Sequence, residues 1–441
     1  MIEWENCSMR FLIVTTAIGL PLLLCFATPS RSDVRPGVLL VPPVTVGVAS
    51  CAAGSCHHGN GNLGSKGSEY STWIAIDPHA KAYRALFNAD SRRIQKNLGG
   101  GNAHENPTCL ACHGMGQDLP ASIQADGVGC EQCHGPAEKW KSSHYLPGFD
   151  RSTTGFVDLR ELGSRADSCM KCHVGDETRE VNHDLIAAGH PRLKFEFAAY
   201  YANYPRHWTY RENEERSLLP DQEARLWVVG QAASARAALD LLATRAERSE
   251  KNWPEFAEYD CASCHHDLLD ESSRRDRASR MVAKGRKPGE LPWADWYHVV
   301  PRLTGSQALR IRYAAIENEM ARRVPRAKDV AREARAAATL LRADLSAAVT
   351  AKYAAEQVNR LTTTLARRDD VAADGWDSAA QLYLGLAALS ATRDVPVDRK
   401  ADLKAMRDVL YGSYKPGARS LYDLPTKYDP KKLIPLLKKF E

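Results

Sequence analysis

The pattern of apolar and polar positions changes character near residue 300. Beyond that point, apolar and small residues recur with helical spacing, which predicts helices over 305–323, 327–347, 351–367, 376–390 and 398–411. The helix at 376–390 has the clearest apolar face, made of Trp376, Ala379, Leu382, Tyr383, Leu386 and Leu389. Breaks are expected at Pro325 and Asp374-Gly375. The pattern therefore predicts an α-helical bundle or a helical cover at the C-terminal end.

One long helix is also predicted before residue 300, over 223–247. Its apolar positions lie near a period of 3.6: Leu226, Val229, Ala233, Ala237, Leu241 and Ala243. Upstream of it, stretches such as Gly99-Gly100-Gly101 and Pro147-Gly148 indicate short helices joined by loops. Such segments bury little apolar surface by themselves. We expect a mainly α fold in which bound groups supply much of the core.

Five cysteine pairs each end directly on a histidine. Four have the spacing C-x-x-C-H, and the first is wider, C-x-x-x-x-C-H. The cysteines are Cys51, Cys56, Cys109, Cys112, Cys130, Cys133, Cys169, Cys172, Cys261 and Cys264, and the histidines are His57, His113, His134, His173 and His265. C-x-x-C-H is the attachment signature of c-type haem, with two thioether bonds and a proximal histidine on the iron. The sequence predicts five covalent haems.

Zinc and disulfides are the alternative explanations of this pattern. Zinc knuckles also use C-x-x-C, but they do not require a histidine directly after the second cysteine. A disulfide framework explains the even number of cysteines and not the histidines. The other two of the 12 cysteines, Cys7 and Cys25, lie near the N-terminus. No cysteine of the expected mature chain is left for a disulfide or for a thiol nucleophile.

Nine further histidines are available for the second axial position of the irons. We take His79, His104, His144, His183, His190 and His207 as distal candidates. His58 and His266 follow a motif too closely to reach around its haem, and His298 is also less favoured. Met115 and Met170 are rivals, but the chain has only seven methionines, so bis-histidine ligation is favoured. His183 and His190 would share one face of a regular helix.

The chain divides into three predicted parts. Residues 1–36 contain Arg10 and the apolar run 11–27, which is typical of a secretory signal, with an uncleaved membrane anchor as the alternative. Residues 37–300 form the pentahaem cytochrome region, and residues 301–441, which lack Cys and His, form the helical C-terminal domain. We expect export to the periplasm or an equivalent compartment. The membrane is involved only if the N-terminal segment stays uncleaved.

The net charge does not indicate nucleic acid as a partner. The formal charge is +5, and the two propionates of each haem would offset it. The expected partners are redox proteins, including a membrane-bound electron donor or acceptor.

Segments around the motifs resemble the cytochrome c-554 family of multihaem cytochromes, which is related in haem arrangement to the hydroxylamine oxidoreductases. The resemblance covers roughly residues 50–210 and rests on Trp73…His79-Ala80, His104-Glu105…Cys109-Leu-Ala-Cys-His113, Gly129-Cys130-Glu-Gln-Cys133-His134-Gly135-Pro136 and Ala188-Gly189-His190-Pro191. It implies haems stacked in close parallel and perpendicular pairs that pass electrons. It further implies axial pairs of His57 with His144, His134 with His79, and His173 with a later histidine such as His190.

The resemblance leaves one haem without an assigned distal ligand. In the family the second haem can be five-coordinate, and His104 is the candidate to fill that position on the haem of His113. The chain departs from the family in its wide first motif, in the fifth motif at His265 and in the helical tail.

Two functions follow from these patterns. Closely spaced bis-histidine haems are typical of an electron carrier, which needs no general acid or base. The alternative is an oxidoreductase with one open iron that acts on a small nitrogen or sulfur compound. We expect the carrier, because the histidines are numerous enough to close every iron.

Overall fold

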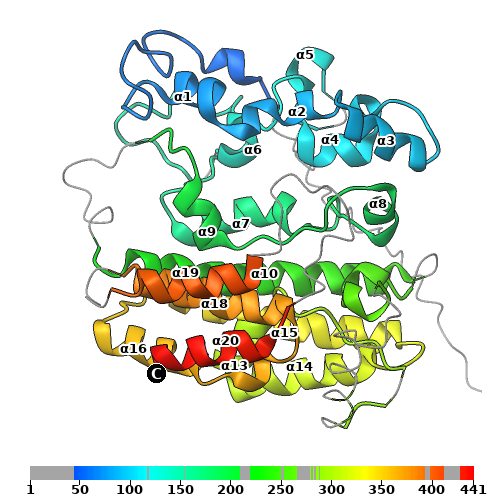
Figure 1. The fold of residues 1–441 in the computed structure, drawn as a ribbon. Helices are drawn as coiled ribbons and strands as arrows, with labels where there is room; N and C mark the ends of the chain where they lie inside the picture. The colour runs from blue at the N-terminus through cyan, green and yellow to red at the C-terminus, as the bar shows by residue number, and fades with distance from the viewer. Residues whose placement is uncertain are drawn as a thin grey trace, which may run out of the picture. The chain divides into compact units, whose positions relative to one another are not determined.

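The computed structural model describes residues 44–441 except 117–118, 153, 209–218, 250–252, 266–278, 280–281, 283–284, 288, 393–397 and 412–427. The predicted targeting segment and His266 lie outside these residues. Regular structure in the described part of the chain is helical, and its extended backbone pairs only at the isolated bridge between Tyr259 and Trp293. The prediction of a mainly α fold is confirmed (Figure 1).

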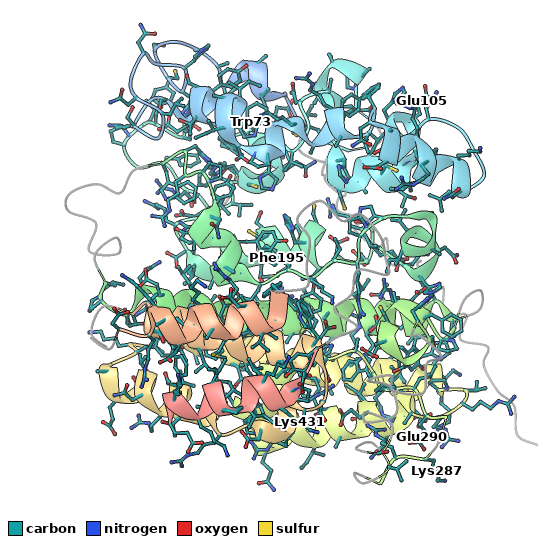
Figure 2. All side chains as sticks on the ribbon, in the orientation of Figure 1. Trp73, Glu105, Phe195, Lys287, Glu290 and Lys431 are labelled. Carbon is teal, nitrogen blue, oxygen red and sulfur yellow. The ribbon has the colours of Figure 1, made fainter. Side chains whose placement is uncertain are left out.

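Short helices make up the first half of the described chain. They are α1 (Glu69–Ile76), α2 (Ala82–Ala85), α3 (Ala89–Asn97), α4 (Pro107–His113), α5 (Ala121–Gln124), α6 (Cys130–His134), α7 (Leu162–His173), α8 (His183–Ala188) and α9 (Phe197–Asn203). Their own apolar clusters are small: Val48, Trp73 and Ala80 form one, and Leu86, Ala103 and Leu110 form another. Trp73 is labelled among these helices in Figure 2. Protein side chains alone bury little apolar surface here.

Longer helices follow. They are α10 (Gln222–Glu247), α13 (Val299–Thr304), α14 (Gln307–Met320), α15 (Ala327–Thr350), α16 (Ala355–Ala366), α17 (Asp369–Ala372), α18 (Trp376–Ser390), α19 (Lys400–Tyr411) and α20 (Pro430–Leu437). The six helices predicted from the apolar pattern correspond to α10, α14, α15, α16, α18 and α19. Helix α20 was not predicted. It begins at Pro430, where Asp429 caps the Lys431 amide.

Helix α10 lies between the motif-bearing helices and the C-terminal helices. It packs against α7 and α9 on one side and against α15 and α18 on another. Its apolar positions are therefore buried nearly all round, including Trp227, Val229, Leu239 and Leu242. Residues 43–441 form one unit. The division at residue 300 stays a prediction.

Glycine permits the close approach of α9 to α10. A Cβ atom at Gly230 would lie 2.6 Å from the Cβ of Phe197, closer than carbon atoms pack. Phe197 is 1% exposed. Helix α7, which carries the fourth motif, packs on the same long helix through Met170, whose sulfur accepts a hydrogen bond from the Ser234 hydroxyl. The long helix thus fixes the fourth motif on a rigid support.

Candidate haem sites

Three of the five motifs lie at the C-terminal ends of helices. Helices α4, α6 and α7 end on His113, His134 and His173, respectively. In C-x-x-C-H the three side chains occupy positions i, i+3 and i+4, which share one face of a helix. The motif therefore directs both thiols and the imidazole to the same side. The first motif lies in a turn, and the fifth begins in a 3₁₀ turn at Cys261–Ser263.

Each motif histidine faces one other histidine. The distances between ring centres are 6.0 Å for His57 and His144, 6.1 Å for His79 and His173, 6.5 Å for His113 and His190, 6.5 Å for His134 and His207, and 6.3 Å for His183 and His265. The five distances between ring centres thus differ by no more than about half an ångström.

This separation fits a metal ion between two imidazoles. With metal–nitrogen bonds of about 2 Å on opposite sides, the two ring centres lie about 6 Å apart. Direct ring stacking would bring them closer, as for Trp293 and His298 at 4.1 Å. The donor set is also chemically suitable, because neutral imidazole is a common axial ligand of haem iron. The residues present therefore fit haem at all five pairs.

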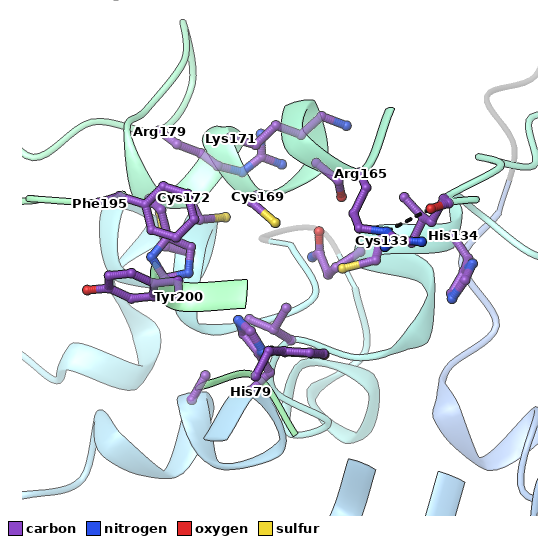
Figure 3. Close-up of a pocket in the computed structure, with 18 of the residues that line it drawn as sticks. His79, Cys133, His134, Arg165, Cys169, Lys171, Cys172, Arg179, Phe195 and Tyr200 are labelled. Atoms are coloured by element: carbon purple, nitrogen blue, oxygen red, sulfur yellow. Dashed lines mark hydrogen bonds between the residues drawn. The ribbon is translucent and has the colours of Figure 1, made fainter. Parts of the chain in front are cut away.

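A cavity of about 2100 Å³ connects several of these pairs. Pockets for one small molecule usually measure about 300–1,000 Å³, so this cavity has room for more than one. Figure 3 shows Cys133, Cys169, Cys172 and His79 around it. Both histidines of the pairs His79–His173, His113–His190 and His134–His207 line it. The space and its cysteines agree with adjacent haems in motifs two to four.

Cysteine contacts show which motifs are neighbours. The side chain of Cys51 interacts with that of Cys130. The side chain of Cys112 interacts with that of Cys172. The first motif therefore adjoins the third, and the second adjoins the fourth.

A buried carboxylate joins the segment before the first motif to the third motif. Glu131, inside the third motif, accepts hydrogen bonds from the amides of Val46 (3.0 Å), Gly47 (2.8 Å) and Ala137 (2.6 Å). Glu131 is only 5% exposed. Unpaired buried amides are costly, so these bonds favour one arrangement of the two motifs.

Two histidines of the pairs are supported by carboxylates. His57 Nδ1 lies 3.0 Å from Glu69 Oε2, and His79 Nδ1 lies 2.9 Å from Asp77 Oδ1. The Tyr204 hydroxyl donates to the other oxygen of Asp77 at 2.6 Å. Burial alone would raise the pKa of Asp77, but the hydrogen bonds from His79 and Tyr204 outweigh it and lower the pKa. Such carboxylate–histidine contacts orient metal ligands and raise their basicity.

Other paired histidines have weaker partners. The Nδ1 atoms of His113, His144 and His190 lie within hydrogen-bonding distance of the carbonyl oxygens of Ala82 (3.2 Å), Lys141 (2.8 Å) and Pro191 (2.8 Å), respectively. The buried Nδ1 atoms of His134 and His207 have no hydrogen-bond partner among the described residues. Burial lowers the pKa of His134 and of His173 to about 4. Both imidazoles are neutral at pH 7, the form that binds metals.

The structure differs from the resemblance in two axial pairs. His79 faces His173 rather than His134, and His190 faces His113 rather than His173. His207 takes the place opposite His134. Only the pairing of His57 with His144 agrees with the expectation.

His183 and His190 do not share a helix face. Helix α8 ends at Ala188, because Gly189 adopts a φ of 122°. The chain turns there, and His190 points to the second motif while His183 points to the fifth. The sequence gives no direct sign of this turn beyond the glycine itself.

His104 is the distal candidate that faces no motif histidine. Its ring stacks on Phe87 with centres 4.2 Å apart, and its Nε2 lies 3.6 Å from Glu105. The position opposite His113, for which His104 was the candidate, is taken by His190. His104 was predicted as a distal ligand because it is close to the second motif in sequence.

The less favoured histidines lie elsewhere. His58 contacts Tyr70, with ring centres 5.0 Å apart. His298 is buried, stacks on Trp293, and its Nδ1 lies 3.2 Å from the Tyr313 hydroxyl. The structure therefore gives His298 a role in packing.

Both methionine rivals are engaged in packing. The sulfur of Met115 accepts the Gly129 amide at 3.3 Å, and Met170 belongs to the core beside α10. Each is less than 10% exposed. Neither is needed opposite a motif histidine, since all five already face another histidine.

Three contacts bring the fifth motif to His183. The His183 amide donates to Glu255 Oε1 at 2.8 Å. The Arg192 guanidinium donates to the carbonyls of Ala257 (3.1 Å) and Tyr259 (3.4 Å), two residues of the segment just before Cys261. These bonds connect residues far apart in sequence. No local signal indicated that His183 would meet the fifth motif.

Sequence reasoning also missed the carboxylates. Asp77 is two residues before His79, and the pattern Asp-Pro-His could have identified it, because Asp77 caps the 3₁₀ turn that begins at Pro78. Glu69 lies twelve residues after His57, and nothing in the sequence connects the two. Their roles depend on the fold.

Part of this chain is similar to known cytochromes. Residues 50–135 match the family described as cytochrome c554 and c-prime. Cytochrome c-554 of Nitrosomonas europaea is 29% identical over 22% of this chain and 49% of its own length, so the match spans about half of that relative. No solved structure matches the chain. The chain is therefore a cytochrome c-554-like protein, with the attachment motifs of a c-type cytochrome that holds its haem covalently.

Proposed function

We propose that this chain is an exported multihaem cytochrome that carries electrons between redox protein partners through five bis-histidine haems. The proposed thioether residues are the ten cysteines of the motifs, and the proximal ligands are the five motif histidines. The proposed distal ligands are His144, His190, His207, His79 and His183, for motifs one to five in order. The observation that supports this most directly is the common separation of 6.0–6.5 Å in five His–His pairs.

Adjacent sites favour electron transfer as the role. The first motif adjoins the third and the second adjoins the fourth, and one cavity joins motifs two to four. Haem supplies the one-electron chemistry when bound. The chain's own residues hold the imidazoles in place and exclude water: His134 and Phe195, for example, line the cavity, and Phe195 is 4% exposed. Figure 2 labels Phe195 between the layers of helices.

The oxidoreductase alternative requires an iron with an open position. Each motif histidine of this chain has a second histidine opposite it, which supports closed, low-spin irons.

No helix of the described residues has both the length and the apolar character to cross a membrane.

Two measurements test the proposal. Intact-mass spectrometry of the purified mature protein should show five added haems, and four haems with free Cys51 and Cys56 would refute the assignment of the first motif. The reduced protein should keep its Soret band in the presence of CO, because every iron has two histidine ligands. A CO-shifted band would instead support the oxidoreductase alternative.

A further inference from the structure

The partners of the paired histidines are unequal, and Asp77 is the strongest of them. Its side chain is fully buried, whereas that of Glu69 is 26% exposed. Asp77 accepts the His79 amide at 2.9 Å and faces His79 Nδ1 at 2.9 Å through one oxygen, while its other oxygen accepts from Tyr204. The carboxylate is held in one orientation by three hydrogen bonds.

A carboxylate at Nδ1 changes the ligand as well as its position. With Nε2 as the iron ligand, Nδ1 would carry a proton and donate a hydrogen bond to the carboxylate, which would give the imidazole partial imidazolate character. Such a ligand donates more electron density and stabilises the oxidised iron. Burial strengthens the effect, because the hydrogen bond and the negative charge act in a medium of low dielectric constant.

We propose that Asp77 acts as a positioning residue that makes the haem between His79 and His173 the most reducing of the four centres of motifs one to four. The inference rests on the proposed function, since it requires a haem at this pair.

The other sites lack one or more of these features. Glu69, the second carboxylate, is partly exposed and also accepts the Gly67 amide at 2.9 Å, so solvent weakens its effect on His57. At the pair His113–His190 both Nδ1 atoms face neutral carbonyls. At the pair His134–His207 neither Nδ1 has a partner among the described residues. Among the paired histidines of motifs one to four, His79 is therefore expected to be the most basic ligand.

The site of His79 and His173 lies between two other candidate sites, so a low potential there would affect how electrons pass through the protein. Its motif adjoins the second motif through Cys172 and Cys112, and Cys169 of the same motif interacts with Cys133 of the third. The most reducing centre would thus lie between two others. Electrons at rest would occupy the flanking haems, and this centre would carry them only in transit.

The first experiment compares Asp77→Asn with Asp176→Asn in the full holoprotein. Asparagine keeps an acceptor oxygen toward His79 but removes the charge. Asp176 interacts electrostatically with Cys172 but bonds Thr178 and Arg179 rather than a histidine, so its variant measures the loss of a nearby charge alone. In a redox titration followed by absorbance, Asp77→Asn should raise the lowest midpoint potential clearly more than Asp176→Asn does. Equal shifts, or no shift, would overturn the proposal.

The second experiment tests a variant in which the lowest midpoint potential should change in the opposite direction. Tyr204→Phe removes a donor to Asp77, so the carboxylate becomes a stronger acceptor for His79 and the lowest potential should fall. A loss of packing alone would not shift the lowest midpoint potential in opposite directions in Asp77→Asn and Tyr204→Phe. An unchanged or raised potential in Tyr204→Phe overturns the proposal, also in the case where Asp77→Asn fails to mature.

The haem count separates this inference from the proposed function. Each variant is first examined by intact mass and by its low-spin spectrum. Five haems with unshifted potentials would reject the role of Asp77 and leave the electron carrier standing. A wild-type protein without haem at Cys169 and Cys172 would reject both.

Discussion

The imidazole rings of His183 and His265 lie 6.3 Å apart between their centres, with ring planes 27° from parallel. His183 is the first residue of α8, and His190, just beyond the end of that helix, faces His113. The two histidines are only seven positions apart in the sequence, and most of the residues between them belong to α8. One short segment therefore brings the second and fifth candidate sites close together, although the fifth motif lies outside the region that matches the cytochrome c-554 family.

His183→Ala should open one of the five proposed irons. With its distal ligand gone, one haem is expected to become high-spin and, when reduced, to bind CO, as absorbance and electron paramagnetic resonance spectra would show. His104→Ala is the matched control and should leave both spectra unchanged, because His104 stacks on Phe87. A high-spin signal in His104→Ala, with none in His183→Ala, would reverse the ligand assignment.

Gly189→Ala should destabilise the fold by about 1–3 kcal/mol, the usual cost of a strained backbone conformation. Gly189 has a φ of 122°, and a Cβ atom there would lie 3.3 Å from Ile94 Cγ1. Gly148, with a φ of 78° and open space around it, is the control, and alanine there should cost less. Urea unfolding monitored by circular dichroism measures both. Only Gly189→Ala should also perturb the spectrum of the haem at His190, and equal behaviour of the two variants would contradict this account.

Glu196 should make stability depend on pH. Burial raises its pKa to about 7 from an ordinary value of 4.5. Between these two values the unfolded chain has already lost the proton that the folded chain keeps, so folding stability falls as the pH rises from about 4.5 to 7. The contribution is roughly 3 kcal/mol, at 1.36 kcal/mol for each pKa unit.

Glu196→Gln should remove this part of the pH dependence. Glutamine keeps an oxygen that can accept the Ala199 amide, which Glu196 bonds at 2.7 Å. Urea unfolding of the variant and of the wild type at pH 5 and at pH 7.5 gives the comparison. The same slope in both proteins would show that Glu196 does not titrate in this range.

Leu382→Ala should weaken the helical layer by about 2–5 kcal/mol through the cavity that it leaves. Leu382 is fully buried in the main apolar cluster, together with residues of α10. Ile311→Ala is the control, because Ile311 is 58% exposed, and it should change stability by less than about 0.5 kcal/mol. Urea unfolding distinguishes the two. A loss in Leu382→Ala no larger than in Ile311→Ala would mean that this cluster does not hold the layer together.

The elements that the sequence predicted well have local causes. The apolar face of 376–390 repeats with the helical period, and Ala379, Leu382, Leu386 and Leu389 are indeed buried. Helix α10 was predicted almost to its end residues, because small and apolar residues recur with a helical period over about seven turns. In both cases the residues that define the element are neighbours in the chain.

The histidine pairs could not be predicted in the same way. Proximity in sequence favoured His104 for the second motif, whereas the fold places His190 there. The resemblance favoured His79 for His134, whereas Asp77 and Tyr204 hold His79 beside His173. Each pairing depends on the direction that the chain takes after loops such as the turn at Gly189. These turns lie outside the motifs, so the motif sequences do not indicate them.

The sequence by itself determined the candidate attachment residues, because each motif is a chemical unit of two thiols and an imidazole within five residues, or within seven in the first motif. It also determined the mainly α class, because helical periodicity is a local property. Only the tertiary structure decided which histidine faces which motif, which motifs are neighbours and which imidazole receives a buried carboxylate. These relationships join residues from separate helices, and their geometry is set by the packing of α7 and α9 against α10 and of α8 against α3.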